Sequence, residues 1–335
     1  MADISIPLYF VKSVIRHAKQ YGLDSSQLLR RSRISPRLLQ GSQARVSAEQ
    51  YARLQTLTMR EMGDEMLGYC PQPSRIGQWS ALCHWLIRCR NLGQVLKRCS
   101  LFFAIVEKSF LLELTIADEE AILAIRPAAG NATPPAPFAY ELFAFSLHRQ
   151  LCWLTKSNIP LQRVALPYPE PEHIGEYSAL LAGAPAKFGA QECQLVFSRK
   201  LLQMPVAQTP DTLAEFLRKP LYNFLVNSFQ ATSWHQRIKA LIGSDLSKLP
   251  TFEEIASTLE QNPKRLRRLL NDEGLTYSDL KLQLRRDIAI NHLARKKYSI
   301  EYIAQKTGFS EASAFIRAFK MWTGVTPLTY RKDLV

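Results

Sequence analysis

Four basic side chains on one short helix are the strongest candidates for chemistry in this sequence. Residues 262–270 predict a helix in which Asn262 is the N-cap and Pro263 takes the first position, where its missing N–H costs nothing. The leucines expected to point inward are Leu266, Leu269 and Leu270. The exposed positions then carry Lys264, Arg265, Arg267 and Arg268. Because arginine can donate two parallel hydrogen bonds to guanine and also binds phosphate, this pattern favours a nucleic-acid ligand, with base and phosphate roles open among the four.

A second helix, expected over residues 310–319, offers a less polar set of side chains. Phe315 and Phe319, with either Met321 or Trp322, should pack against the protein. The residues left facing outward are Glu311, Ala312, Ser313, Ile316, Arg317 and Lys320. The small and aliphatic members of this set can contact thymine methyl groups, but they cannot hydrogen-bond to base edges. This helix is therefore expected to read DNA partly through apolar contacts.

An internal repeat places both helices in the same local order. Thr251-Phe-Glu-Glu-Ile-Ala256 recurs 48 residues later as Ser299-Ile-Glu-Tyr-Ile-Ala304. Each copy starts with a hydroxyl residue suited to N-capping, continues through a turn into one of the two helices above, and ends at a glycine, Gly274 or Gly324. Two helices joined by a tight turn are typical of a helix-turn-helix unit. The sequence thus predicts two such units, at 251–274 and 299–322.

A helix over residues 277–297 should connect the two units. Tyr277, Leu280, Leu284 and Ile288 recur at helical spacing and form its packing stripe. Roughly twenty residues of α-helix span on the order of 30 Å, and one turn of B-DNA is about 34 Å. A rigid connection of that length would set the two exposed helices into successive major grooves.

The overall charge agrees with a polyanionic partner. The 335 residues include 43 Lys and Arg against 29 Asp and Glu, a formal net charge of +14. Residues 231–335 hold 18 basic and 11 acidic residues, a net charge of +7, and residues 1–230 carry the same net charge over about twice the length. A basic protein without any polyanionic ligand would also have this composition, so the motifs carry the argument.

Helical and strand patterns divide the chain into three parts. Residues 1–210 are expected to form an effector-sensing and dimerisation domain, helical over 1–100 and α+β over 101–210. Residues 211–233 should be a linker helix and linker, followed by an all-α tandem helix-turn-helix domain at 234–335. The predicted fold is mainly α with a small α+β sensor portion.

A small antiparallel meander is expected inside the α+β part. Short, partly alternating apolar runs occur at residues 102–107, 110–116 and 121–126. Alternation of this kind is typical of strands that bury one face. The many aromatic residues around them are expected either to form a core or to line a ligand cavity.

The C-terminal residues resemble the AraC/XylS family of bacterial transcription regulators. The resemblance covers about residues 234–332 and is carried by the repeat copy beginning at Ser299, by Gly308-Phe309, by Gly324-Val-Thr-Pro327 and by Tyr330-Arg331. It implies two helix-turn-helix subdomains joined by a long helix, with base contacts from the second helix of each. Members of this family often carry longer polar residues where this sequence has Ala312 and Ala314.

The N-terminal part is similar to the sensor region of one branch of that family, described as arabinose-binding-like or ornithine-regulator-like. The matching pieces are Gly63-Asp64, Leu67-Gly68, Asn91-Leu-Gly93, Gly183-Ala-Pro-Ala-Lys-Phe-Gly189 and Gln194-Leu-Val-Phe197. This similarity implies an effector-sensing and dimerising domain. It does not imply that the ligand is a sugar, and the sequence assigns no effector-binding residue.

Other chemistry finds little support in the residues. No catalytic, nucleotide-binding or zinc-protease motif is present, and no cofactor is expected. His148 and Cys152 have the i, i+4 spacing of metal ligands but lack a second pair, so no metal is expected. The cysteines form no CxxC pair and no apolar run is long enough to span a membrane, which favours a cytoplasmic protein with reduced thiols. Basic residues near the N-terminus, Arg30, Arg31, Arg33 and Arg37, are interpreted as either a second basic patch or a solvated helix face.

These observations favour a sequence-specific transcriptional regulator, more readily an activator, that binds double-stranded promoter DNA. RNA polymerase is an expected partner, a small-molecule effector is expected to modulate binding, and a homodimer through the N-terminal domain is expected. Two alternatives stay open. The first is a ligand-independent regulator whose N-terminal domain only dimerises. The second is an enzyme-like domain fused to a DNA-binding one.

Overall fold

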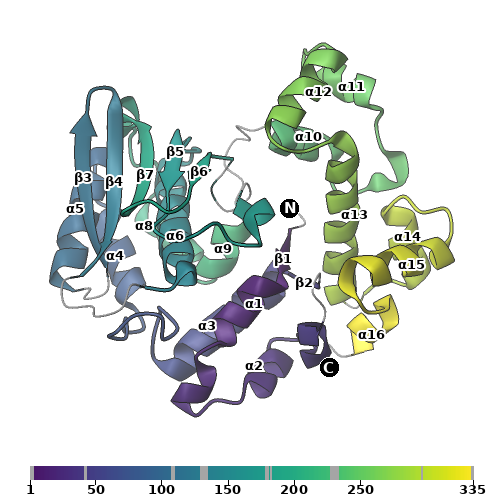
Figure 1. Cartoon of the computed structure of the whole chain (residues 1–335), viewed down its shortest axis with the longest axis horizontal. Helices are drawn as coiled ribbons and strands as arrows, with labels where there is room; N and C mark the ends of the chain where they lie inside the picture. The colour runs from purple at the N-terminus through teal and green to yellow at the C-terminus, as the bar shows by residue number, and fades with distance from the viewer. Residues whose placement is uncertain are drawn as a thin grey trace. The chain divides into compact units, whose positions relative to one another are not determined.

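Two compact units make up the structure. The computed structural model describes residues 4–40, 44–106, 110–128, 135–177, 181, 183–226, 234–295 and 297–332. The first unit combines residues 1–57 with residues 225–335, and the second unit consists of residues 58–224 (Figure 1). The sequence pattern assigns residues 1–57 to the sensor region, whereas in the structure they group with the C-terminal helices. The physical reason is a set of buried contacts to the helix at 277–294, described below.

The C-terminal part of the first unit is helical wherever the structure describes it. Its elements are α10 (Trp234–Ile242), η5 (Leu246–Lys248), α11 (Phe252–Thr258), α12 (Pro263–Asp272), α13 (Tyr277–Ala294), α14 (Ile300–Lys306), α15 (Ala312–Thr323) and α16 (Pro327–Lys332). The predicted all-α fold of this region is confirmed. α13 ends at Ala294, slightly before the expected residue 297. It starts at a capping box, in which the Thr276 hydroxyl accepts from the Asp279 amide and the Asp279 carboxylate accepts from the Thr276 amide.

The N-terminal segment, residues 4–57, is mostly helical and contains a short two-stranded sheet. Its elements are β1 (Ser5–Pro7), α1 (Leu8–Ile15), η1 (Ala18–Tyr21), α2 (Ser25–Arg31), η2 (Pro36–Gln40), β2 (Arg45–Ser47) and most of α3 (Ala48–Met62). β1 and β2 are antiparallel, with Ser5 opposite Ser47, and both strands contact α13. Strands of three residues are too short to show an alternating pattern, so the sequence predicted only helix here.

The second unit is built around a five-stranded sheet. The helices before and after it are α4 (Gln78–Leu86), α5 (Leu92–Ile105), α6 (Pro137–Thr155), η3 (Ile174–Glu176), η4 (Arg199–Gln203), α8 (Pro210–Phe216) and α9 (Pro220–Val226). The strands are β3 (Phe110–Ala117), β4 (Glu120–Pro127), β5 (Arg163–Ala165), β6 (Ala186–Lys187) and β7 (Cys193–Ser198). Their order is β3-β4-β7-β5-β6, with β5 and β6 parallel and the other neighbours antiparallel.

One face of this sheet is buried under helices. Phe110 and Leu112 of β3 alternate with exposed residues, and their side chains lie on the buried face. The ring of Phe143 in α6 lies 5.0 Å from that of Phe110 and 5.0 Å from that of Phe103 in α5. These aromatic residues therefore form the core between α5, α6 and the sheet, as the sequence allowed.

The strand expected at 102–107 is wrong, whereas those expected at 110–116 and 121–126 are confirmed as β3 and β4. Residues as far as Ile105 continue α5. Phe102 and Phe103 are both buried there, and the ring of Phe102 lies 6.1 Å from that of Trp85 in α4. Two adjacent apolar residues that are buried on a helix give the same short apolar run in the sequence as a buried strand does. This explains why a strand was expected here.

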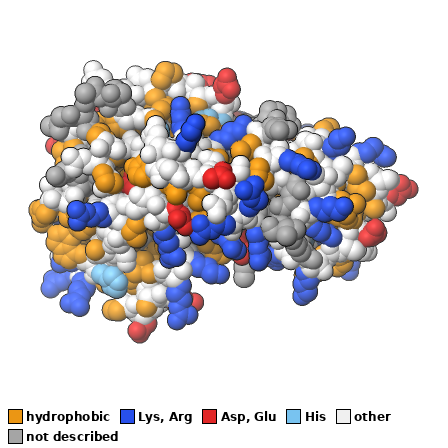
Figure 2. Space-filling model, turned by 90° about the horizontal axis from the view of Figure 1, so that it is seen from below, with side chains coloured by type: hydrophobic (Ala, Val, Ile, Leu, Met, Phe, Trp, Pro, Cys, Tyr) orange, Lys and Arg blue, Asp and Glu red, His pale blue; other side chains and the backbone are white. Residues whose placement is uncertain are grey.

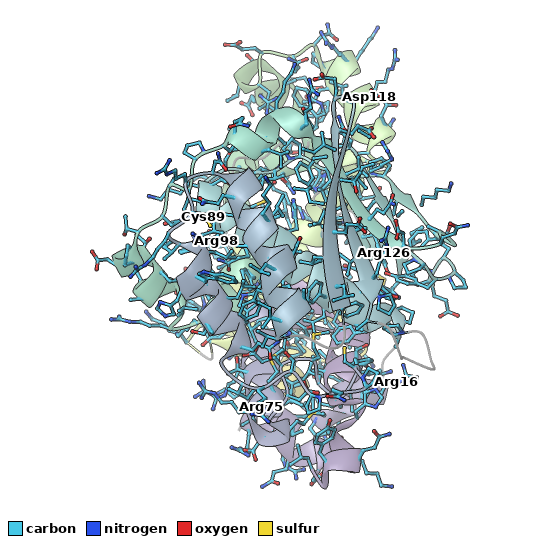
Figure 3. The ribbon with its side chains drawn as sticks, turned by 90° about the vertical axis from the view of Figure 1, so that its left-hand side faces the viewer. Arg16, Arg75, Cys89, Arg98, Asp118 and Arg126 are labelled. Atoms are coloured by element: carbon cyan, nitrogen blue, oxygen red, sulfur yellow. The ribbon has the colours of Figure 1, made fainter. Side chains whose placement is uncertain are left out.

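The other face of the sheet carries ion pairs. Arg126 of β4 is paired with Glu113 of β3 and with Glu192, which directly precedes β7. Figure 3 shows Arg126 at the sheet, while Arg98 and Cys89 lie among the helices on the opposite side. The Arg98 guanidinium donates to the Trp85 carbonyl at 2.9 Å and lies over the Trp85 ring.

Metal-binding clusters and membrane-spanning helices are both absent from the described residues. Over the ranges given above, no three His, Cys, Asp or Glu side chains are grouped so that they could hold a metal ion. His148 Nε2 lies 2.8 Å from the Ile159 carbonyl oxygen, and burial lowers the pKa of this histidine to about 4. Among the same residues, none of the helices combines the length and apolar character needed to cross a bilayer.

Candidate nucleic-acid interface

The first helix-turn-helix unit consists of α11 and α12. The Thr251 hydroxyl accepts from the Glu254 amide at 3.2 Å, while the Glu254 carboxylate accepts from the Thr251 amide at 2.7 Å, so the predicted capping box is present. The Asn262 side chain caps α12 by accepting from the Lys264 amide at 2.9 Å. Leu266 of α12 is completely buried, in a cluster that also contains residues of α10, α11 and α13.

All four basic side chains predicted on α12 are exposed. They are Lys264, Arg265, Arg267 and Arg268, and they cover the side of α12 away from the buried leucines. Two of them also contact other residues of the first helix-turn-helix unit. The Arg267 guanidinium lies 5.1 Å from the centre of the Phe252 ring, and Arg268 Nε lies 4.0 Å from the Asp272 carboxylate one turn along the helix. The Arg268 side chain is 85% exposed, so this pair leaves it available to a ligand.

The second unit of the tandem consists of α14 and α15. The Ser299 hydroxyl caps α14 by accepting from the Tyr302 amide at 3.1 Å. Phe315, Phe319 and Trp322 of α15 are buried, while Met321 is 67% exposed, so Trp322 is the third packing residue. α15 begins at Ala312, two residues later than expected.

The outward-facing residues predicted for α15 have two degrees of exposure. Glu311, Ser313, Arg317 and Lys320 are exposed, whereas Ala312 and Ile316 are half-buried. The Ser313 hydroxyl donates to the Glu311 carboxylate at 3.1 Å. Compared with α12, this surface presents fewer basic side chains and more apolar ones.

Both helix-turn-helix units pack against α13, and the second one also contacts the segment between α10 and α11. Arg285 of α13 donates to the Gly308 carbonyl at 3.4 Å, and its guanidinium lies 5.1 Å from the centre of the Phe309 ring. Lys306 of α14 is ion-paired with Asp245, which lies between α10 and η5. Arg285 and Lys306 therefore fix the second helix-turn-helix unit in place. A basic residue in the sequence of α13 does not by itself identify a DNA contact.

The turn between α14 and α15 contains one position that requires glycine. Gly308 has a φ of +75°, a left-handed conformation that residues with a Cβ adopt at a cost. A Cβ built at this position would lie 2.9 Å from the Leu246 carbonyl oxygen, closer than such atoms approach. The turn of the second helix-turn-helix unit therefore packs directly on the backbone of η5.

Two comparisons with protein families decide what this arrangement is. A model of the N-terminal arabinose-binding domain of AraC transcription regulators matches residues 22–206, and a helix-turn-helix domain model matches residues 255–333. The chain belongs to the AraC family of transcription regulators. The predicted resemblance of both parts to this family is confirmed.

Relatives in this family match the chain over its full length or over its DNA-binding part. The ornithine utilization regulator of Pseudomonas aeruginosa is 24% identical over 98% of this chain and 96% of its own length. The urease operon transcriptional activator of Escherichia coli is 33% identical over 29% of this chain and 33% of its own. The crystal structure of the transcriptional regulator CdpR from Pseudomonas aeruginosa is 20% identical, covering 76% of this chain and 81% of that one, with a TM-score of 0.30.

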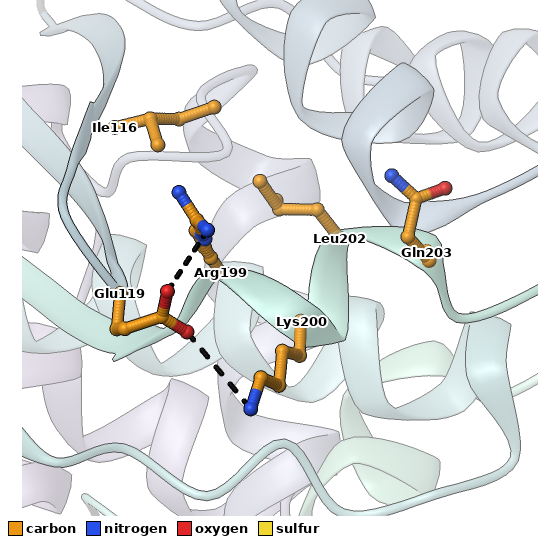
Figure 4. A pocket seen from close by; sticks show the side chains of 6 residues that line it. All are labelled: Ile116, Glu119, Arg199, Lys200, Leu202 and Gln203. Atoms are coloured by element: carbon orange, nitrogen blue, oxygen red, sulfur yellow. Dashed lines mark ion pairs between the residues drawn. The ribbon is translucent and has the colours of Figure 1, made fainter.

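A pocket in the second unit lies where η4 meets the turn between β3 and β4 (Figure 4). It encloses about 540 Å³ and is lined by Ile116, Glu119, Arg199, Lys200, Leu202 and Gln203. The carboxylate of Glu119 pairs with Arg199 at 2.8 Å and with Lys200 at 3.9 Å. Because these three side chains are about half exposed or more, the pocket does not bury a small ligand as effector sites do.

A buried polar cluster in the second unit was not foreseen from the sequence. Glu141 of α6 is 3% exposed, and its Oε1 accepts a hydrogen bond from the Tyr177 hydroxyl. His173 Nε2 lies 3.2 Å from the same oxygen, and the hydroxyls of Tyr168 and Tyr177 are 3.0 Å apart. The four residues are up to 36 positions apart in sequence, so no local motif could indicate them.

Proposed function

We propose that this AraC-family regulator binds promoter DNA by inserting α12 and α15 into successive major grooves. The base and phosphate contacts would come from Lys264, Arg265, Arg267 and Arg268 of α12 and from Glu311, Ala312, Ser313, Ile316, Arg317 and Lys320 at α15. The observation that carries the proposal is that two capped helix-turn-helix units, each with an exposed second helix, lie at opposite ends of one helix, α13.

The length of α13 supports this arrangement. Its 18 residues span about 27 Å, somewhat less than the ~34 Å of one duplex turn. One chain would thus read two half-sites on one face of the duplex, as two subunits do in simple helix-turn-helix dimers.

The experiment that tests the proposal selects bound sequences from random duplexes with the full-length protein. The selected sites should contain two short conserved blocks about 10 base pairs apart, and affinity should fall steeply with salt because phosphates are neutralised. Arg268→Ala and Arg317→Ala should each remove specific binding while the fold stays intact. Normal affinity of both variants for the selected site would refute these assignments.

The second unit is proposed to sense a small molecule. The arabinose-binding domain model matches residues 22–206, most of which lie in the second unit, and this supports the role. One full-length relative is named a regulator of ornithine utilization. A thermal-shift screen of the full protein tests it, since a ligand that binds only the folded state raises stability by RT ln(1 + [L]/Kd). If no ligand shifts the melting temperature, the alternative that this unit only dimerises is favoured.

Dimerisation is proposed to use α5 and β3 of the second unit. Leu101 and Ile105 of α5 are 52% and 70% exposed, and Ile116 of β3 is 56% exposed. In the described sheet β3 has a neighbouring strand on one side only. Exposed apolar side chains beside an unpaired strand edge are typical of protein interfaces. Sedimentation of the full chain with and without Ile105→Glu would test the dimer.

The remaining parts of the proposal follow from membership of the family. The protein would act as an activator that contacts RNA polymerase, and it would work in the cytoplasm, where bacterial promoters are. The named relatives are regulators, which favours this reading over an enzyme fused to a DNA-binding domain. A transcription assay with purified polymerase and the selected site would show whether bound protein raises or lowers transcript yield.

A further inference from the structure

The excess of basic over acidic residues lies almost entirely in the first of the two units. The first unit, residues 1–57 and 225–335, has 27 Lys and Arg against 14 Asp and Glu, while the second has 16 against 15. Residues 1–57 alone hold nine basic and three acidic residues, a higher density of positive charge than residues 225–335. The N-terminal segment is therefore the most basic part of the unit that binds DNA.

The N-terminal segment is fastened to α13 by buried hydrogen bonds. The Ser5 hydroxyl donates to the Asp287 carboxylate and accepts from Arg45 Nε at 2.7 Å. The side chains of all three residues belong to the buried part of the unit, each less than a tenth exposed. Asn291, one turn beyond Asp287, donates to the Ile4 carbonyl at 3.3 Å.

A second set of hydrogen bonds joins this segment to α16 of the DNA-binding region. The hydroxyl of Tyr330, a completely buried residue, lies 3.1 Å from Gln50 Oε1 and 3.3 Å from the Arg45 carbonyl oxygen. The amide of the Gln50 side chain donates in turn to the Arg33 carbonyl. Arg33, just beyond α2, is thus two hydrogen bonds away from α16. The Tyr330 ring of α16 lies 5.6 Å from the Phe319 ring of α15, which links the segment to the second helix-turn-helix unit.

The end of α2 and the adjoining η2 expose a group of arginines. This α2–η2 basic cluster consists of Arg30, Arg31, Arg33 and Arg37, all exposed. Asp24 is the only acidic residue between positions 4 and 40, and its pairing with Arg30 at 3.8 Å is between side chains more than half exposed. Lys332 adds an exposed charge on α16. Figure 2 shows that Lys and Arg side chains predominate over Asp and Glu on the surface that it draws.

We propose that the α2–η2 basic cluster binds backbone phosphates of the duplex beside the half-site contacted by α15. The inference rests on the proposed DNA-binding function and adds a third contact from outside both helix-turn-helix units. Arginine at an exposed surface neutralises phosphates without reading sequence, so the contact would add affinity and salt dependence without specificity. Its attachment to α13 and α16 places the contact on the α15 side.

The test uses the full-length protein with all four arginines of the cluster changed to glutamine, R30Q/R31Q/R33Q/R37Q. Binding to a labelled mixed-sequence 40-base-pair duplex is followed by fluorescence anisotropy between about 50 and 200 mM KCl. Loss of two phosphate contacts lowers the slope of log affinity against log salt by roughly 1.8, so the wild type loses about tenfold more affinity than the variant over this range. The matched lysine variant, R30K/R31K/R33K/R37K, should restore the wild-type slope.

The control removes the same number of exposed charges from the second unit. Its variant is R75Q/R88Q/R90Q/K97Q, and its salt slope should equal that of the wild type. Removing the base pairs that flank the α15 half-site from a selected duplex should lower the affinity of the wild type but not that of the glutamine variant of the cluster. Equal slopes for the cluster variant and the wild type would overturn the inference. Absence of any duplex binding by the wild type would instead overturn the proposed function.

Discussion

Lys306 of α14 forms an ion pair with Asp245, so the second helix-turn-helix unit is attached to the segment that precedes the first. The hydrogen bond from Lys306 is the main cause that lowers the pKa of Asp245 to about 2. Asp245 also accepts from the Ser247 amide at 3.1 Å. The pair thus connects two elements whose relative position decides where the recognition helices lie.

Lys306→Met removes this ion pair and leaves the hydrogen bond from Ser247 to Asp245 in place. The pKa of Asp245 in the folded state lies below the ~3.9 of an unfolded aspartate. The pair therefore stabilises the fold above about pH 4, and this stabilisation is lost as pH falls toward 2. Urea unfolding should show a less stable variant at pH 7 and a difference that shrinks toward pH 3. A difference that stays constant with pH would contradict the role of Asp245.

Gly308→Ala should destabilise the protein more than Gly274→Ala. Both glycines have a left-handed φ, +75° and +74°, which costs an alanine about 1 kcal/mol. A Cβ at Gly274 meets no atom within 4 Å, whereas one at Gly308 meets the Leu246 carbonyl oxygen at 2.9 Å. The free energies of unfolding of the two variants measure the difference directly. Equal losses would show that the turn does not pack on η5.

Tyr330→Phe tests the attachment of the N-terminal segment to the DNA-binding region. The substitution keeps the buried ring and removes the hydroxyl that lies within hydrogen-bonding distance of Gln50 and the Arg45 carbonyl. A loss of about 1–2 kcal/mol in the free energy of unfolding is expected, as for a buried hydrogen bond. Tyr302→Phe, on an exposed ring, is the control and should be neutral. If both variants are equally stable, the attachment contributes nothing.

The sequence predicted the DNA-binding region because its signals are local. Thr251, Asn262 and Ser299 cap the helices that they were expected to cap. Leu266 and Leu270 of α12 and the phenylalanines of α15 are buried as expected, while Leu269 is half-buried. Caps and helical periodicity act over a few residues and can be read without an alignment. The exposure of the four basic residues of α12 follows from the same periodicity.

The place of the N-terminal segment was not predicted because its contacts span most of the chain. Ser5 and Asp287 are 282 positions apart, and Tyr330 and Gln50 are 280 apart. Each of these residues looks unremarkable within its own stretch of sequence. The one available signal was composition, since residues 1–57 are more basic than the C-terminal region. Counting residues 1–230 together hides this excess, because residues 58–230 carry almost as many acidic as basic residues.

Hydroxyl-radical footprinting of the full-length protein on a selected site measures the central claim most directly, namely that one chain reads two half-sites with α12 and α15. Two protected windows are expected on one face of the duplex, about 10 base pairs apart. Arg268→Ala should weaken one window and Arg317→Ala the other, while the control Lys97→Ala leaves both unchanged. A single window, or the same window weakened by both substitutions, would contradict the account.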